Sequence, residues 1–275
     1  MPTPLHRTSF QAERYAAEPA ARAGTAPVRL GLDLKQNRSM KWITHLCLAC
    51  ACTAAQAETP LPFGAPGAAP VAPWHVAGLP KQSKPFTTFA VVDLDGRRAL
   101  RIEADSSYGN LVYPLQPARA VARLSWQWRA DELIEADDLR TKAGDDTALK
   151  VCVFFDLALD KVPFVERQLL RVVRSQSSEP LPAATVCYVW DAHLPVGTAI
   201  PNAFTKRVRY KVLESGPARL HQWTAERRNL EADFIELFGD ESKEVPLVTG
   251  VAVGADADNT HGHSLAHVVD LVLEP

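Results

Sequence analysis

Strict alternation of apolar and polar residues is the feature that most limits how this chain can fold. In RLSWQWRA, residues 123–130, the leucine and both tryptophans would point to one side of an extended strand, and the polar residues between them to the other. A period of two residues fits a half-buried strand and does not fit a helix. We therefore expect Trp126 and Trp128 to lie in a hydrophobic core.

Strand-like segments recur from residue 86 almost to the end of the chain, with short polar turns between them. They cover residues 86–94, 98–104, 111–115, 122–130, 148–156, 184–190, 205–214, 247–254 and 267–273. Asp95 and Gly96, between the first two segments, form a typical hairpin signal. Many short strands joined by short turns predict a mainly β protein, a β-sandwich.

Two segments interrupt the strands with apolar residues at helical spacing. The first begins at Pro163 and ends before SQSSEPLP, residues 175–182. The second runs from about Pro217 to Phe238, and Gly239 can cap its C-terminus. Both segments predict α-helices inserted in the sandwich.

An export signal is expected inside the chain and not at its start. Met40 is followed by Lys41, by a run without formal charge, and by Ala-Gln-Ala at residues 55–57. This is the order of a secretory signal peptide that is cleaved before Glu58. A membrane anchor is the alternative, but a spanning helix needs roughly 20 apolar residues and this run is shorter. We expect residues 40–57 to be removed, which leaves a periplasmic or secreted protein without a membrane span.

The rest of the chain divides around this signal. Residues 1–39 predict a disordered arm, or a stretch upstream of a true start at Met40. Residues 58–85 form a proline-rich lead-in, and residues 86–275 form the β-sandwich domain. The formal net charge is −2 and no basic tract stands out, which argues against nucleic acid as a partner. Nothing in the sequence indicates the oligomeric state.

Cys152 and Cys187 are the two cysteines that follow the signal. Both lie in strand-like segments, and an oxidising compartment would permit a disulfide between them. Buried free thiols are the alternative, because cysteine packs as a small apolar residue. The sequence leaves this choice open.

Five motifs in a fixed order give the chain a resemblance to a family. They are RTKAGDD at 140–146, YVW at 188–190, PNAF at 201–204, ERRNLEADFIELFGD at 226–240 and GADADNT at 254–260. The chain resembles the bacterial domain of unknown function 3047 family over roughly residues 86–273. The resemblance implies an exported bacterial protein with a jelly-roll or galactose-binding-like sandwich, and it implies no particular activity.

The first candidate site is the loop that carries Arg140, Lys142, Asp145 and Asp146. Adjacent carboxylates can bind a cation, or one of them can act as a general base whose pKa the neighbouring charges set. The alternative is a turn in which the two basic side chains neutralise the two acids. All four residues are candidates for ligand binding.

The second candidate site is the loop GADADNT. Asp256 and Asp258 could supply part of a structural Ca²⁺ site, although Ca²⁺ takes about six to eight oxygen ligands and the loop cannot supply them all. Asx turns explain the same loop without a metal. Asn259 is a candidate ligand-binding residue, and no other cofactor is expected.

Three further residues are candidates for contact with a polar ligand. Trp190 ends a strand beside Asp191 and is expected near a rim, where a sugar ring can stack on the indole. Asn202 and Arg227 belong to the family motifs and could donate hydrogen bonds. Arg227 could equally pair with an acidic neighbour on its own helix.

Two functions compete. No serine-hydrolase elbow, zinc-protease motif or phosphate-binding glycine loop occurs in the sequence. We therefore favour a noncatalytic protein of the cell envelope that binds a glycan or a similar polar ligand. The alternative is a glycan hydrolase or lyase that uses Asp145 or Asp146 with Asp256 or Asp258. The alternative requires the loops 140–146 and 254–260 to meet.

Overall fold

The computed structural model describes residues 57–177 and 179–275. The expected arm, residues 1–39, and almost all of the expected signal peptide, residues 40–57, lie outside the described residues. Neither helix in the described part of the chain has the length and apolar content needed to cross a membrane.

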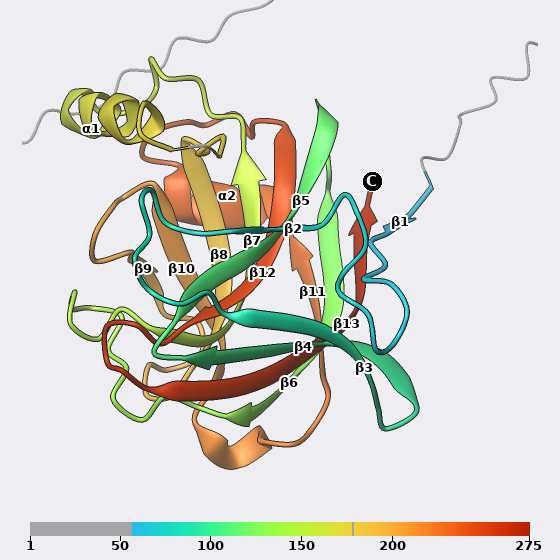
Figure 1. Ribbon diagram of the computed structural model, residues 1–275. Helices are drawn as coiled ribbons and strands as arrows, with labels where there is room; N and C mark the ends of the chain where they lie inside the picture. The colour runs from blue at the N-terminus through green and yellow to red at the C-terminus, as the bar shows by residue number, and fades with distance from the viewer. Residues whose placement is uncertain (1–56, 178) are drawn as a thin grey trace, which may run out of the picture. The chain divides into compact units, whose positions relative to one another are not determined.

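Two β-sheets pack face to face, and two helices lie at their periphery (Figure 1). The first sheet has six strands: β1 (Thr59–Pro60), β3 (Thr88–Leu94), β4 (Arg97–Asp105), β6 (Arg123–Glu132), β11 (Thr224–Asn229) and β13 (His263–Glu274). Its order is β11-β6-β13-β4-β3, and β1 pairs with β13. Every strand pair in this sheet is antiparallel.

The second sheet has seven strands: β2 (His75–Ala77), β5 (Tyr108–Arg119), β7 (Thr147–Phe155), β8 (Ala184–Asp191), β9 (Ala199–Pro201), β10 (Val208–Ser215) and β12 (Val248–Asp256). Its order is β2-β5-β12-β7-β8-β10-β9, and β8 and β10 form a parallel pair. The helices are α1 (Phe164–Arg174) and α2 (Leu230–Phe238), with a short 3₁₀ turn, η1 (Pro217–Arg219). The predicted β-sandwich with two inserted helices is confirmed.

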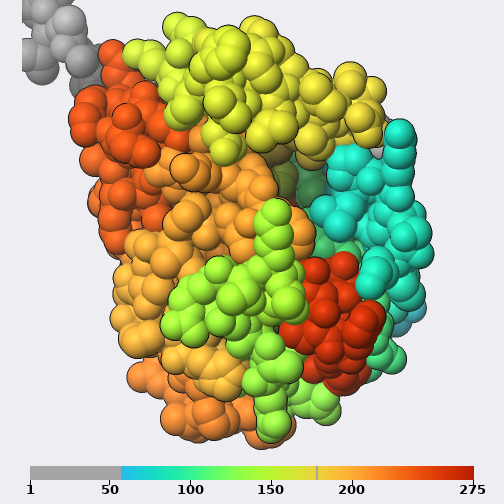
Figure 2. Space-filling model, turned by 90° about the vertical axis from the view of Figure 1, so that its left-hand side faces the viewer, coloured from blue at the N-terminus to red at the C-terminus, as the bar shows by residue number. Residues whose placement is uncertain are grey.

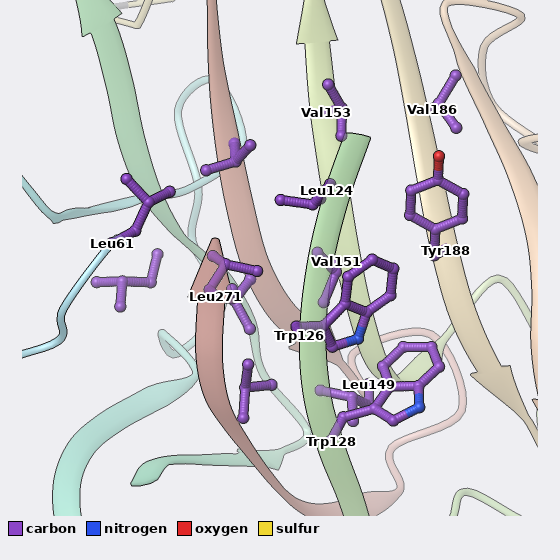
Figure 3. Packing of buried hydrophobic residues seen from close by; sticks show 14 of the residues in the cluster. Leu61, Leu124, Trp126, Trp128, Leu149, Val151, Val153, Val186, Tyr188 and Leu271 are labelled. Atoms are coloured by element: carbon purple, nitrogen blue, oxygen red, sulfur yellow. The ribbon is translucent and has the colours of Figure 1, made fainter. Parts of the chain in front are cut away.

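The core forms where the alternating strands face each other. Trp126 and Trp128 of β6 are at most 1% exposed, as their spacing predicts. Trp126 packs against Tyr188 of β8 with ring centroids 5.3 Å apart, which joins the two sheets (Figure 3). Burying such large side chains is the main source of stability for the sandwich.

The seven-stranded sheet has a second, smaller cluster of buried residues on the side turned away from the other sheet, which we call the outer face. Cys152 of β7 and Cys187 of β8 lie directly opposite each other there and form a disulfide. Leu139 and Leu194 cover this part of the outer face. The choice that the sequence left open is thus resolved in favour of the bridge.

The second predicted helix is wrong over its first half. Helix α1 agrees with the prediction, but Thr224–Asn229 is strand β11, an edge strand paired with β6. In TAERRN every second side chain is half-buried, so the segment has the period of a strand although its inward residues are mostly polar. Helix α2 begins only after Asn229, whose side chain accepts a hydrogen bond from the N–H of Ala232 and caps the helix.

Candidate functional site

The two candidate loops meet where β7 begins and β12 ends. The buried carboxylate of Asp146 accepts hydrogen bonds from Thr260 N (2.7 Å), Thr260 Oγ1 (2.6 Å) and Asn259 N (3.2 Å). The amide of Asn259 also donates to the backbone carbonyl of Asp145 (3.1 Å). Asp146 therefore joins the two loops, and its acceptor sites are used within the protein.

Asp145, the neighbouring acid, turns toward the outer face. Its carboxylate accepts hydrogen bonds from the amide of Asn202 and from the phenol of Tyr210 (3.2 Å). Burial, together with the negative charge of Asp256, raises the pKa of Asp145 to about 6, while Lys150 opposes both effects. One acid of the DD pair thus joins the two loops, and the other is buried on the outer face with a raised pKa.

Asp256 lies beside this carboxylate in a buried ion pair. Its Oδ2 is 2.8 Å from Lys150 Nζ, and both side chains are only 5% exposed. The backbone N–H of Thr147 donates to Oδ1 (2.9 Å), as does the Thr147 hydroxyl. Burial disfavours the ammonium of Lys150, but the adjacent Asp256 carboxylate outweighs it and the pKa of Lys150 is raised.

These groups belong to one set of side chains on the outer face, which we call the outer-face cluster. It brings together β5, β7, β10, β12 and the segments before β7 and β10. Its members are Tyr108, Asn110, Asp145, Lys150, Asn202, Tyr210 and Asp256.

Solvent reaches the outer-face cluster through three of its members. Tyr108, Asn110 and Asn202 are half-buried, whereas the other four are buried. Phe204, two residues after Asn202, is 57% exposed and forms a rim with Lys142, whose Nζ lies 5.2 Å from the ring centroid. A ligand would therefore meet amide and phenol groups first, with an exposed aromatic ring beside them.

A hollow of about 290 Å³ lies next to the cluster, between β2 with the loop up to Phe86 and the segment after α1. Figure 2 shows it between the cyan and the yellow segments. Gln82, in its wall, donates a hydrogen bond to the backbone carbonyl of Tyr108 (2.9 Å). This hydrogen bond connects the wall of the hollow to the backbone of one cluster member, although no side chain of the cluster lines the hollow itself.

Three predicted site residues lie elsewhere. Arg140 is exposed and pairs with Asp138 (2.7 Å). Arg227 lies on β11 of the six-stranded sheet, where it pairs with Glu274, and not on a helix. Trp190 is fully buried, and its Nε1 donates to the carbonyl of Gly216 (3.2 Å), so its expected place at a rim is wrong. Its ring points inward because it lies two residues after Tyr188 on β8, so both side chains take the core face of the strand, while Cys187 and Val189 take the outer face.

The contacts of Asp256 do not fit the calcium role that the sequence suggested. The Lys150 ammonium stands where a cation would have to approach Asp256. In the part of the chain that the structure describes, no group of three or more His, Cys, Asp or Glu side chains is arranged to hold a metal. Asp258 is half-buried, and burial together with the charge of Asp146 raises its pKa.

Four members of the cluster were not expected from the sequence: Tyr108, Asn110, Lys150 and Tyr210. Lys150 had a recognisable signal, because a lysine in the apolar strand ALKVCVFF must find an acidic partner when both faces are buried. The two tyrosines had none, since tyrosine is common in strands of every kind. Their roles depend on which strands become neighbours.

Three solved structures are similar in outline. Endoglucanase 3 of Trichoderma harzianum, from family GH12, is 9% identical with a TM-score of 0.34, covering 74% of this chain and 97% of that one. The xyloglucanase domain of NopAA from Sinorhizobium fredii, in complex with cellobiose, is 7% identical (TM-score 0.33; 72% and 97% covered). The cellulose induced protein Cip1 is 10% identical (TM-score 0.30; 72% and 89% covered). Similarity this low carries no functional conclusion.

No sequence among curated proteins matches the chain. The model of one family, described as protein of unknown function (DUF3047), matches residues 72–272. The chain belongs to this family, which confirms the resemblance in the five sequence motifs.

Proposed function

We propose that this member of the DUF3047 family is an exported protein of the bacterial cell envelope that binds a glycan on the outer face of its seven-stranded sheet. The observation that carries the proposal is the outer-face cluster itself. Seven polar side chains from separate segments converge there beside a hollow, and three of them remain open to solvent. A concave site with a few fixed polar groups is the usual form of a small-ligand site.

The chemistry of the cluster suits a ligand rich in hydroxyl groups. Each sugar hydroxyl both donates and accepts a hydrogen bond, so it needs neighbours of both kinds. Asn110 offers an amide and Tyr108 a phenol, and the Asn202 amide fixes the cluster through its bonds to Asp145, Tyr210 and the N–H groups of Phe204 and Thr205. Phe204 adds an exposed aromatic ring at the rim, on which the apolar face of a sugar can stack.

Two features support export. The stretch at residues 40–57 has the order of charges and small residues that a signal peptidase requires. The disulfide between Cys152 and Cys187 is typical of proteins that mature in an oxidising compartment. Mass spectrometry of the protein from a periplasmic fraction tests this directly, and a mature chain that still carries residues 1–57 would contradict it.

Binding is tested by isothermal titration of the protein against a panel of soluble envelope and plant oligosaccharides. We expect at least one to bind, and the substitutions Asn110→Ala and Phe204→Ala each to weaken its binding about tenfold or more, the effect of losing a central contact. Val196→Ala is the matched control, because this valine is exposed on the loop between β8 and β9 and outside the cluster. The proposal fails if no oligosaccharide binds, or if all three variants bind as the unaltered protein does.

A glycan hydrolase or lyase is the second candidate, and the pKa of Asp145, raised to about 6, is the observation in its favour. Such enzymes use two carboxyl groups, and the second carboxylate near Asp145, that of Asp256, is held by Lys150. This engagement is why we place binding first. Release of new reducing or unsaturated ends from a bound oligosaccharide, lost in Asp145→Asn, would establish catalysis, whereas binding without product would exclude it for that ligand.

A further inference from the structure

Two buried acids outside the outer-face cluster each have one oxygen without a partner. Asp137 lies in the loop between β6 and β7, and Asp191 is the last residue of β8. They are 4% and 2% exposed. Among the carboxylates in the described part of the chain, only Asp137 Oδ1 and Asp191 Oδ2 are buried without a hydrogen-bond partner. Buried polar atoms are rarely left unpaired, so these two oxygens indicate a partner that the chain itself does not supply.

One turn at the end of β8 brings the two acids together. Asp137 Oδ2 accepts a hydrogen bond from the N–H of Ala192 (3.3 Å). Asp191 Oδ1 accepts hydrogen bonds from the N–H groups of His193 (2.7 Å) and Leu194. Burial and, after it, the negative charge of Asp191 raise the pKa of Asp137 to about 7, as expected for carboxylates that lie close to each other. Each acid thus uses one oxygen on the same turn and leaves the other unpaired.

The basic side chains nearby do not neutralise this pair. Arg140, in the same loop as Asp137, is exposed and pairs with Asp138 (2.7 Å). His193 Nε2 lies 3.6 Å from Asp137 Oδ1, but its side chain is 56% exposed and Nε2 contacts the carbonyl of Glu135 at 2.8 Å. In the part of the chain that the structure describes, the two carboxylates are therefore buried together without a lysine or arginine in contact.

Other buried acids of the sandwich have a cation in direct contact. Asp256 lies 2.8 Å from Lys150, and Asp233 lies 2.9 Å from Lys211. A buried carboxylate is stable when it is paired in this way or when it binds a metal ion. Water could fill the missing hydrogen bonds of the two unpaired oxygens, but it would leave both negative charges in place. The choice is therefore between a metal ion and a proton that the two acids share.

We propose that Asp137 and Asp191 bind one Ca²⁺ ion between the loop before β7 and the end of β8. Ca²⁺ takes about six to eight oxygen ligands, and backbone carbonyls and water can complete the set, so no third acidic side chain is required. Mg²⁺ fits less well, because it keeps several of its waters and the two oxygens are buried. The ion fastens Leu139 and Leu194, which follow the two acids, over the outer face. The site is separate from the outer-face cluster, so it can be disproved without affecting glycan binding.

The first test measures calcium binding to the full chain after treatment with EDTA and dialysis. Isothermal titration with CaCl2 should reach the millimolar range, because extracellular calcium sites have Kd values of about 10⁻⁴ to 10⁻³ M. We expect one ion per chain, and the substitutions Asp137→Asn and Asp191→Asn each to raise the Kd about tenfold or more, since each removes one ligand charge. Asp138→Asn is the matched control, because it removes the same charge from the same loop at a side chain that pairs with Arg140.

A second measurement locates the ion without any substitution. In amide NMR spectra of the unaltered protein, CaCl2 should shift the signals of Ala192, His193 and Leu194, whose N–H groups donate to the two carboxylates. The signal of Thr260, whose N–H donates to Asp146 in the loop 254–260, should move much less. Three results would each overturn the proposal: no calcium binding by the unaltered protein, as expected if the acids share a proton; equal weakening by Asp138→Asn; or a shift at Thr260 in place of the turn after β8.

Discussion

The outer faces of the two sheets both carry charged side chains, but they place them in different surroundings. On the six-stranded sheet, Arg101 and Glu103 pair at 2.6 Å with side chains 33% and 32% exposed. On the seven-stranded sheet, Lys150 and Asp256 pair at 2.8 Å with side chains only 5% exposed. Charges attract more strongly where water is excluded, and losing a partner costs more there. The comparison shows why burial raises the pKa of Asp145 on the second face, whereas a hydrogen bond from Arg101 lowers that of Glu103 on the first.

The largest difference is expected from removing one cation on each face. Lys150→Met leaves the Asp256 carboxylate buried without its partner, and we expect the free energy of unfolding to fall by about 3 to 5 kcal/mol. Arg101→Met, its counterpart on the six-stranded sheet, should cost less than about 1 kcal/mol because water replaces the lost charge. Urea unfolding measures both. Equal losses would mean that the two faces do not differ in the way their burial indicates.

An intermediate effect is expected from Asp145. Its pKa is raised from 3.8 to about 6 in the folded protein, so folding takes up a proton between these values and stability falls as pH rises through this window. Asp145→Asn removes this dependence. Relative to the unaltered protein, we expect the variant to gain roughly 2 to 3 kcal/mol of stability between pH 4 and pH 7.5. Urea unfolding of both proteins at pH 4 and at pH 7.5 measures the gain. If the difference in stability between the two proteins were the same at both pH values, burial would not raise the pKa of Asp145.

The smallest effect, with the opposite sign, is expected from Glu103. The hydrogen bond from Arg101 lowers the pKa of Glu103 below its ordinary 4.5, although burial opposes this shift. The pair therefore contributes stability above that pH, and the contribution is lost as the pH falls through the lowered pKa. Glu103→Gln should remove it, with an effect below about 1 kcal/mol at neutral pH. Thermal unfolding of the variant and the unaltered protein between pH 3 and pH 7 measures the difference in stability. A difference that is larger at pH 3 than at pH 7 would contradict the lowered pKa of Glu103.

The parts of the fold that local patterns decide could be predicted from the sequence. Alternation located Trp126 and Trp128 in the core, and Pro163 marked the start of α1. The pattern failed at Thr224–Asn229, because an edge strand that covers the sandwich margin with Glu226 and Arg228 lacks apolar alternation. The apolar residues on either side of this segment recur at helical spacing, which predicted one continuous helix. Pairing with β6 holds the segment as a strand instead.

The candidate site was less accessible to sequence reasoning. The motifs named Asp145, Asn202 and Asp256, but nothing local shows that residues more than fifty positions apart share one cluster. The expectation for Trp190 failed for the same reason, since its place depends on β10 pairing beside β8. Strand order is a long-range property, and it decides which candidates become neighbours.

The bonds from Asp146 to Asn259 and Thr260 have a consequence for recognition. They fix the loop before β7 against the loop after β12 before any ligand arrives, so binding does not require these two loops to become ordered. Association with such a ready-made surface should proceed at the rate of rigid docking. Its heat-capacity change should then report only the area the ligand covers.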